Sequence, residues 1–232
     1  PLAFNVYVSK PSSINKKIQF EGEPIKQKWN GLAQHIAAVV LGNTDTVVLT
    51  LFSTIENVSV YAVYHLVVNG VKQLLMSLTN GIQALLGNMY AKKEIDTLND
   101  TFGWLEWIFH TGVVYVFTCT ALLIVPFVRI YTGGINDANY IVPLFGFLLT
   151  AAQATYCLRL PYNMMVLAAG HYKQTQSSAI IEALINVIVS VLLVLQYGLV
   201  GVAVGTLIAM LYRTTYSAFN SSKDILKRSV IN

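Results

Sequence analysis

Long apolar runs alternate with short polar connections along most of this chain. A membrane-spanning helix needs about 20 predominantly apolar residues. Short polar segments and one turn, at Gly198, separate the runs. Six segments satisfy this length requirement: residues 30–53, 59–90, 101–128, 139–169, 175–197 and 199–220. The pattern predicts an all-α integral membrane protein with a six-helix transmembrane bundle over residues 25–220.

The two ends of the chain have a different character. Residues 1–29 are polar and hold prolines and five lysines, which predicts a linker over 1–24 and a short surface helix near 25–29. Residues 221–232 predict a polar tail. The sequence starts at Pro1, and no signal peptide precedes the first apolar run. We therefore expect the chain to be a piece of a longer protein.

Composition agrees with a membrane location. The chain is 55% hydrophobic and 11% charged, whereas soluble domains carry about 25% charged residues. The net charge of +4 does not indicate nucleic-acid binding, because the positions of basic residues matter more than their sum in a membrane protein. Cys119 and Cys157 lie in apolar runs without metal-binding spacing. We expect both to be small buried residues.

Basic residues divide unevenly between the two sides of the predicted bundle. If the six helices alternate in direction, Arg129 alone falls on one side. The other side receives Lys10, Lys16, Lys17, Lys26, Lys28, Lys92, Lys93, Lys173, Arg213, Lys223, Lys227 and Arg228. Positive residues prefer the cytoplasmic side, so both termini are predicted to be cytoplasmic. Trp29, Trp104 and Trp107 fall near the same boundary, as an aromatic belt requires.

Polar residues inside the predicted helices follow single faces. In segment 59–90 they recur at steps of mostly three or four, which aligns them in one stripe. This stripe contains His65, Asn69, Lys72, Gln73, Met76, Asn80, Gln83 and Gly87. A second stripe in segment 175–197 contains Glu182 and Asn186. The neutral members either bond across helices, at about 0.6 kcal/mol each, or line a polar pathway.

Four ionisable residues lie at membrane depth: Asp45, Lys72, Arg159 and Glu182. A charge at the centre of a membrane helix costs about 2.5–3.5 kcal/mol on insertion scales. The four either pair internally as structural elements or line a watered pathway or ligand site. We expect Asp45 to face inward, within reach of Lys72. Pro161 lies two residues after Arg159 and permits a kink there.

No enzyme motif is visible. The sequence has no HExxH, Walker loop or GxSxG motif, and its histidines have no acidic or metal-ligand partners at useful spacing. We therefore expect neither catalytic residues nor a metal site.

Several stretches carry a family resemblance, which covers about residues 25–220. They are "NTDTVVLTLFSTIENVSVYAVYHLV", "IQALLGNMYAKK", "RLPYNMMVLAAGHYKQTQSSAIIEALINVIVSVLLV" and "YGLVGVAVGTLIAMLYR". In this order they resemble the C-terminal half of oligosaccharide flippases of the polysaccharide transport family. That family belongs to the multidrug, oligosaccharidyl-lipid and polysaccharide exporter superfamily. The motifs are helix-length patterns with scattered Asp, Gly and Asn.

The resemblance implies a fold of two six-helix lobes that face each other across a cavity. This chain would be the C-terminal lobe, with residues 1–24 as the inter-lobe linker and an N-terminal lobe as its partner. Such flippases move undecaprenyl-pyrophosphate-linked oligosaccharide repeat units across the bacterial cytoplasmic membrane for surface polysaccharide biosynthesis. Alternating access by rocking of two bundles fits the physics of such transporters.

The resemblance also suggests roles for the polar residues. Lys72 and Arg159 are candidate cationic partners of the substrate pyrophosphate. Asp45 and Glu182 either hold these cations in the empty site or carry H⁺ or Na⁺ for coupling, and no other cofactor is expected. The candidate sugar-binding stripe consists of His65, Asn69, Gln73, Asn80, Gln83 and Asn186.

Two alternative functions stay open. A cation-coupled multidrug exporter of the same superfamily would favour a cavity dominated by carboxylates, whereas acids and bases balance here. A structural membrane subunit without transport activity would pair all four charges within the lobe and leave no polar groove.

Overall fold

The computed structural model describes residues 28–170 and 172–222, which are almost entirely helical and contain no strand. The predicted linker 1–24 and nearly all of the predicted tail 221–232 lie outside these residues. The helices are α2 (Lys28–Phe52), α3 (Ile55–Ser77), α4 (Thr79–Lys92), α5 (Ile95–Tyr131), α6 (Pro143–Leu158), α7 (Leu160–Ala169) and α8 (Tyr172–Asn220).

Three helices are long and apolar enough to span a membrane: Gly31–Phe52, Ile95–Tyr131 and Thr175–Asn220. They indicate a membrane protein, but they do not reproduce the predicted count of six. Predicted segment 59–90 is divided at Leu78 into α3 and α4. Segment 139–169 is divided at Arg159 into α6 and α7, which have 16 and 10 residues. Pieces of that length are too short to cross a bilayer alone.

The break between α6 and α7 has a local cause. Pro161 lies in the first turn of α7, where its missing N–H is tolerated, whereas it would remove a hydrogen bond from a continuous helix. Nε2 of His110, from α5, lies 3.2 Å from the carbonyl oxygen of Leu158. The predicted interruption near Arg159 is therefore present, and a side chain from a neighbouring helix contacts the backbone beside it.

A glycine folds α8 into a hairpin. Gly198 has φ 53° and ψ −126°, a conformation that residues with a Cβ rarely adopt, and it separates two arms, 172–197 and 199–220. A Cβ on Gly201 would collide with the Leu193 carbonyl, and one on Gly205 would collide with Ser190. The two glycines thus let the arms pack closely. The predicted turn at Gly198 is confirmed.

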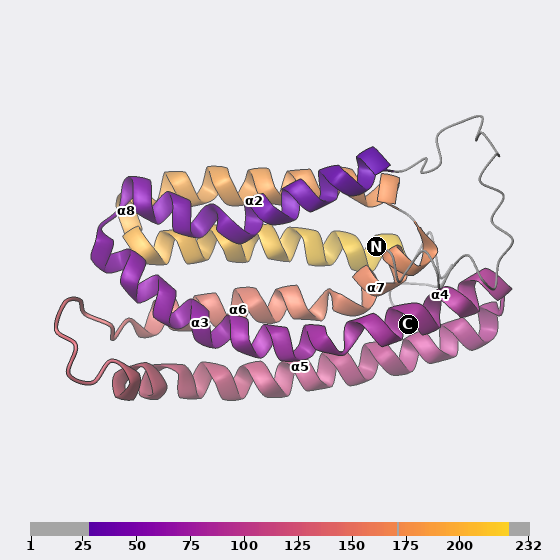
Figure 1. Cartoon of the computed structure of the whole chain (residues 1–232), viewed down its shortest axis with the longest axis horizontal. Helices are drawn as coiled ribbons and strands as arrows, with labels where there is room; N and C mark the ends of the chain where they lie inside the picture. Colours follow the sequence, from indigo (N-terminus) through magenta and orange to yellow (C-terminus); the bar gives the residue numbers. More distant parts are fainter. Residues whose placement is uncertain (1–27, 171, 223–232) are drawn as a thin grey trace, which may run out of the picture.

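The helices run side by side along the long axis of the molecule (Figure 1). α2 packs mainly against α8, and α6 packs against α8, α5 and α3. The start of α2, the α4–α5 turn and the end of α8 lie at one end of the bundle, whereas the α2–α3 turn, the α5–α6 connection and the bend of α8 lie at the other (Figure 1). The chain therefore passes back and forth between the same two ends of the bundle.

The bundle exposes many large apolar side chains and buries several charged ones, unlike a soluble protein. Large apolar side chains point outward, and Leu74 and Leu122 are more than two-thirds exposed. Asp45, Arg159 and Glu182 are at most 4% exposed. An apolar exterior around buried charges is expected of a bundle whose surroundings are lipid and whose polar groups satisfy one another inside.

Candidate functional site

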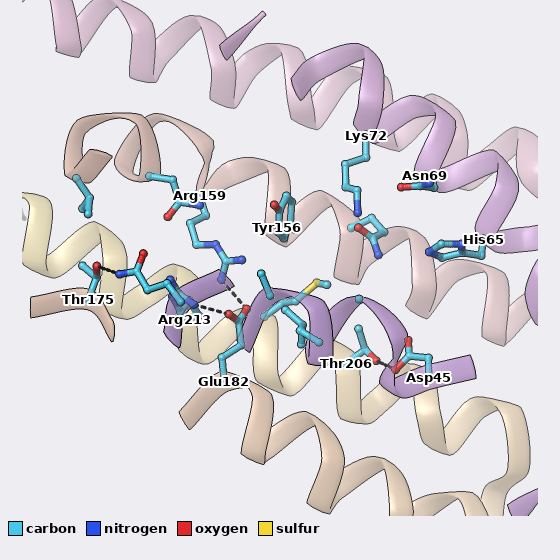
Figure 2. A pocket seen from close by; sticks show the side chains of 18 of the residues that line it. Asp45, His65, Asn69, Lys72, Tyr156, Arg159, Thr175, Glu182, Thr206 and Arg213 are labelled. Carbon is cyan, nitrogen blue, oxygen red and sulfur yellow. Dashed lines mark hydrogen bonds and ion pairs between the residues drawn. The ribbon is translucent and has the colours of Figure 1, made fainter. Parts of the chain in front are cut away.

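A cavity of about 380 Å³ lies among α2, α3, α6, α7 and α8. Figure 2 shows side chains from these helices converging on it. Its ionisable lining consists of three basic residues, two carboxylates and one histidine: Lys72, Arg159, Arg213, Asp45, Glu182 and His65. Its other polar lining residues are Gln34, Tyr61, Asn69, Gln153, Tyr156, Asn163, Thr175 and Thr206. All four ionisable residues predicted at membrane depth therefore meet at one cavity.

Glu182 lies between two arginines. One of its oxygens accepts a hydrogen bond from Arg159 at 2.6 Å, and the other accepts one from Arg213 at 2.8 Å. Arg159 is at the α6–α7 break, Glu182 is on the first arm of α8, and Arg213 is on the second arm. The cluster therefore connects three chain segments in a buried environment, where unpaired charges would be costly.

Asp45 is held by neutral donors. Its carboxylate accepts hydrogen bonds from the Thr206 hydroxyl at 2.7 Å and the Tyr61 hydroxyl at 3.2 Å. The Asn186 amide lies 3.5 Å from it and donates to Thr206 at 2.9 Å. Asp45 faces inward, as predicted, but within the described residues it has no basic partner. Hydroxyl and amide donors from α3 and both arms of α8 take the place of a cation.

Lys72 lies apart from both carboxylates. Its Nζ is 5.0 Å from the centre of the Tyr156 ring, and Cζ of Arg159 is 4.8 Å from the same ring. Figure 2 shows Tyr156 between the two basic side chains. Cation–π contacts of this kind contribute about 0.5–2 kcal/mol. The expected proximity of Lys72 and Asp45 does not lead to an ion pair, because Lys72 turns toward α6 whereas Asp45 turns toward α8.

The predicted stripe lines the cavity over part of its length. His65, Asn69 and Lys72 line it, and His65 stacks on Tyr61 with ring centroids 5.2 Å apart. Gln73, at the edge of the stripe, is exposed. Gln83 is half-buried on α4, which begins after the interruption at Leu78, and does not line the cavity. The side chain of Asn80 lies outside the described part of the structure.

Asn186 and Arg213 differ from their predicted roles. Asn186 is fully buried and acts behind the cavity wall, through its bonds to Thr206 and Asp45. Arg213, which the sequence assigns only to the basic residues of the cytoplasmic side, lines the cavity and binds Glu182. Thr206 and Arg213 are seven residues apart on one arm, so they share a face. That spacing identifies a third polar stripe, on the second arm of α8.

Comparison with known proteins adds no identification. No protein family, no curated protein and no solved structure matches this chain. The resemblance to oligosaccharide flippases therefore stays a prediction.

The cavity has the chemistry of an anion-binding site. Three basic residues and two carboxylates give its lining a formal excess of one positive charge. Two of the basic groups are guanidinium groups, whose planar donor arrays match carboxylate and phosphate oxygens. The described residues contain no group of three or more His, Cys, Asp or Glu side chains that could hold a metal ion.

Proposed function

We propose that this chain is one lobe of a flippase that moves lipid-pyrophosphate-linked oligosaccharides across the bacterial cytoplasmic membrane. The observation that carries the proposal is the cavity, which has an excess of basic residues and lies inside a bundle with an apolar exterior. A pyrophosphate group cannot enter lipid without compensation of its charge. A buried site with Lys72, Arg159 and Arg213 offers that compensation.

The proposed topology has six crossings. α2, α5 and the two arms of α8 each cross once, whereas α3 with α4 and α6 with α7 form two composite crossings that are interrupted at Leu78 and Arg159. Successive connections between these crossings lie alternately at the two ends of the bundle, which supports this count (Figure 1). Lys92 and Lys93 lie at the end where α2 starts, which supports cytoplasmic termini. Interrupted helices beside a polar site are frequent in transporters.

Within this proposal different cavity residues bind different parts of the substrate. The basic groups bind the pyrophosphate, and neutral polar groups such as Asn69, Gln153 and Asn163 bind sugar hydroxyls. An N-terminal lobe would close the other side of the cavity and rock against this lobe.

The two alternative functions predict different arrangements of charge in the cavity. The cation-coupled exporter gains support from Asp45, a buried carboxylate without a basic partner among the described residues. A purely structural subunit is less favoured, because Lys72 forms no ion pair within the described residues and the polar cavity is present.

Transport by the complete two-lobe protein tests the proposal. Lys72→Gln and Arg159→Gln are each expected to lower flipping of the lipid-linked oligosaccharide about tenfold or more, since a charge-assisted hydrogen bond contributes about 1.5–3 kcal/mol. Arg213 still compensates Glu182 in Arg159→Gln, so the fold should persist. Lys92→Gln and Arg129→Gln are the matched controls, because both side chains are exposed and outside the cavity.

Normal flipping by both cavity variants, at normal membrane levels, would remove the anion-binding claim. Binding assays separate the flippase from the exporter. We expect the purified protein to bind geranylgeranyl pyrophosphate in preference to ethidium, a cationic dye, and the reverse preference would favour the exporter.

A further inference from the structure

Glu182 uses both of its carboxylate oxygens, but its two arginine partners do not use all of their donors. Each guanidinium group gives Glu182 one terminal nitrogen, although it has five N–H donors. Nε of Arg159 and Nε of Arg213 are buried and have no hydrogen-bond partner within the described residues. The cluster therefore has more donors than its single carboxylate can satisfy.

The cluster also has more positive than negative charge. Two guanidinium groups face one carboxylate, so the cluster retains one uncompensated positive charge in a site where Arg159 and Glu182 are at most 3% exposed. Buried ionic groups are stable only when both their charge and their donors are satisfied. An anion with more oxygens and more charge than a carboxylate would satisfy this cluster better than Glu182 does.

The position of the cluster makes exchange of anions feasible. Arg159, Arg213 and Glu182 all line the cavity, and Figure 2 shows Glu182 reaching up between the two arginines from the first arm of α8. The two carboxylate oxygens are shared between the guanidinium groups, as two oxygens of a phosphate would be. Lys72 approaches the same region across the Tyr156 ring.

We propose that Glu182 is an internal counter-ion that a pyrophosphate group displaces from Arg159 and Arg213 when substrate enters the cavity. This inference rests on the proposed function, because it requires an anionic substrate. In the empty site Glu182 neutralises one arginine charge and ties the α6–α7 break to both arms of α8. In the loaded site the pyrophosphate binds both guanidinium groups, and the carboxylate moves away from them into the cavity.

Competition by Glu182 has a measurable consequence: its removal should tighten anion binding. We propose to measure binding of inorganic pyrophosphate and of geranylgeranyl pyrophosphate to the purified complete protein, as wild type and as Glu182→Gln. Glu182→Gln is expected to bind both probes about tenfold more tightly, a change of about 1.4 kcal/mol. The two probes distinguish recognition of the anion from recognition of the lipid, since only the second carries a polyprenyl chain.

The matched control is Glu56→Gln, which makes the same chemical change at an exposed position in the first turn of α3. Its affinity should stay within about twofold of wild type, because the effect of an exposed charge is screened by salt. An equal gain in both variants would mean that net charge, and not the contact with the arginines, sets the affinity, and would overturn the inference. Equal or weaker binding by Glu182→Gln than by wild type would also overturn it.

The same measurements separate this inference from the proposed function. Wild-type binding without a gain in Glu182→Gln would overturn only the counter-ion role, whereas binding by neither protein would overturn both proposals. If Glu182→Gln does not fold, Glu182→Asp replaces it. The aspartate keeps the charge but is one methylene shorter, so it cannot bridge both arginines in the same way, and its affinity should exceed that of wild type.

Discussion

Glu182 and Asp45 are buried carboxylates that line one cavity, but they have opposite kinds of partner. Glu182 lies between two guanidinium groups, whereas Asp45 accepts hydrogen bonds from hydroxyl and amide groups. Ion pairing ties Glu182 to the charges of its neighbours, so losing this carboxylate leaves two arginines without a counter-ion. Asp45 has neutral donors, so removing its charge leaves no partner charge uncompensated. The two sites should therefore respond differently to the removal of charge.

The largest expected effect is that of Glu182→Leu. This change leaves Arg159 and Arg213 side by side without their shared carboxylate. Removal of one partner from a buried ionic cluster costs about 3–5 kcal/mol, so the free energy of unfolding in detergent should fall by that amount. A loss below about 1 kcal/mol would mean that the cluster is solvated, and the contrast with Asp45 would disappear.

A smaller effect is expected for Thr206→Val, which preserves the shape of the side chain but removes the hydroxyl that donates to Asp45 at 2.7 Å. Hydrogen bonds to charged groups contribute about 1.5–3 kcal/mol, and equilibrium unfolding should show a loss in this range. Thr215→Val, at an exposed position on the same arm, is the matched control. Equal losses in both variants would show that the threonines affect only helix stability.

The smallest effect is expected for Asp45→Asn. Asparagine has nearly the same shape and keeps one acceptor oxygen, and the Tyr61 and Thr206 hydroxyls can rotate to meet its amide. The free energy of unfolding should change by less than about 1 kcal/mol, measured beside Glu182→Leu under identical conditions. A loss as large as that of Glu182→Leu would indicate that Asp45 has an ionic partner outside the described residues, and would remove the distinction between the two sites.

Much of the architecture follows from the apolar pattern. Helices α2 and α5, the turn at Gly198 and the interruption near Pro161 were predictable because apolar length, glycine and proline act locally. The division at Leu78 was not, because "LLMSLTNG" contains no proline and its one glycine follows three residues later. The helix count by length and hydropathy is three, since the two arms of α8 count as one helix and interruptions and polar stripes remove the other two segments.

The site was predictable in its members but not in their pairing. A charge at membrane depth is costly wherever it lies, so Asp45, Lys72, Arg159 and Glu182 could be selected without a structure. Partners depend on the rotation of each helix about its axis, which the sequence does not specify. Glu182 therefore pairs with Arg159 and Arg213, whereas Asp45 has no basic partner within the described residues.

The bend at Gly198 joins the two arms that carry Glu182 and Arg213. Each residue lies about 22–24 Å from the bend, at about 1.5 Å per residue along its arm, so the two arms act as levers of nearly equal length with a shared pivot. A rotation of about 5° at the pivot displaces an arm by about 2 Å at that distance. The 2.8 Å contact between Glu182 and Arg213 would then exceed the roughly 4 Å limit of an ion pair. A small angular change at Gly198 would thus be enough to separate Glu182 from Arg213.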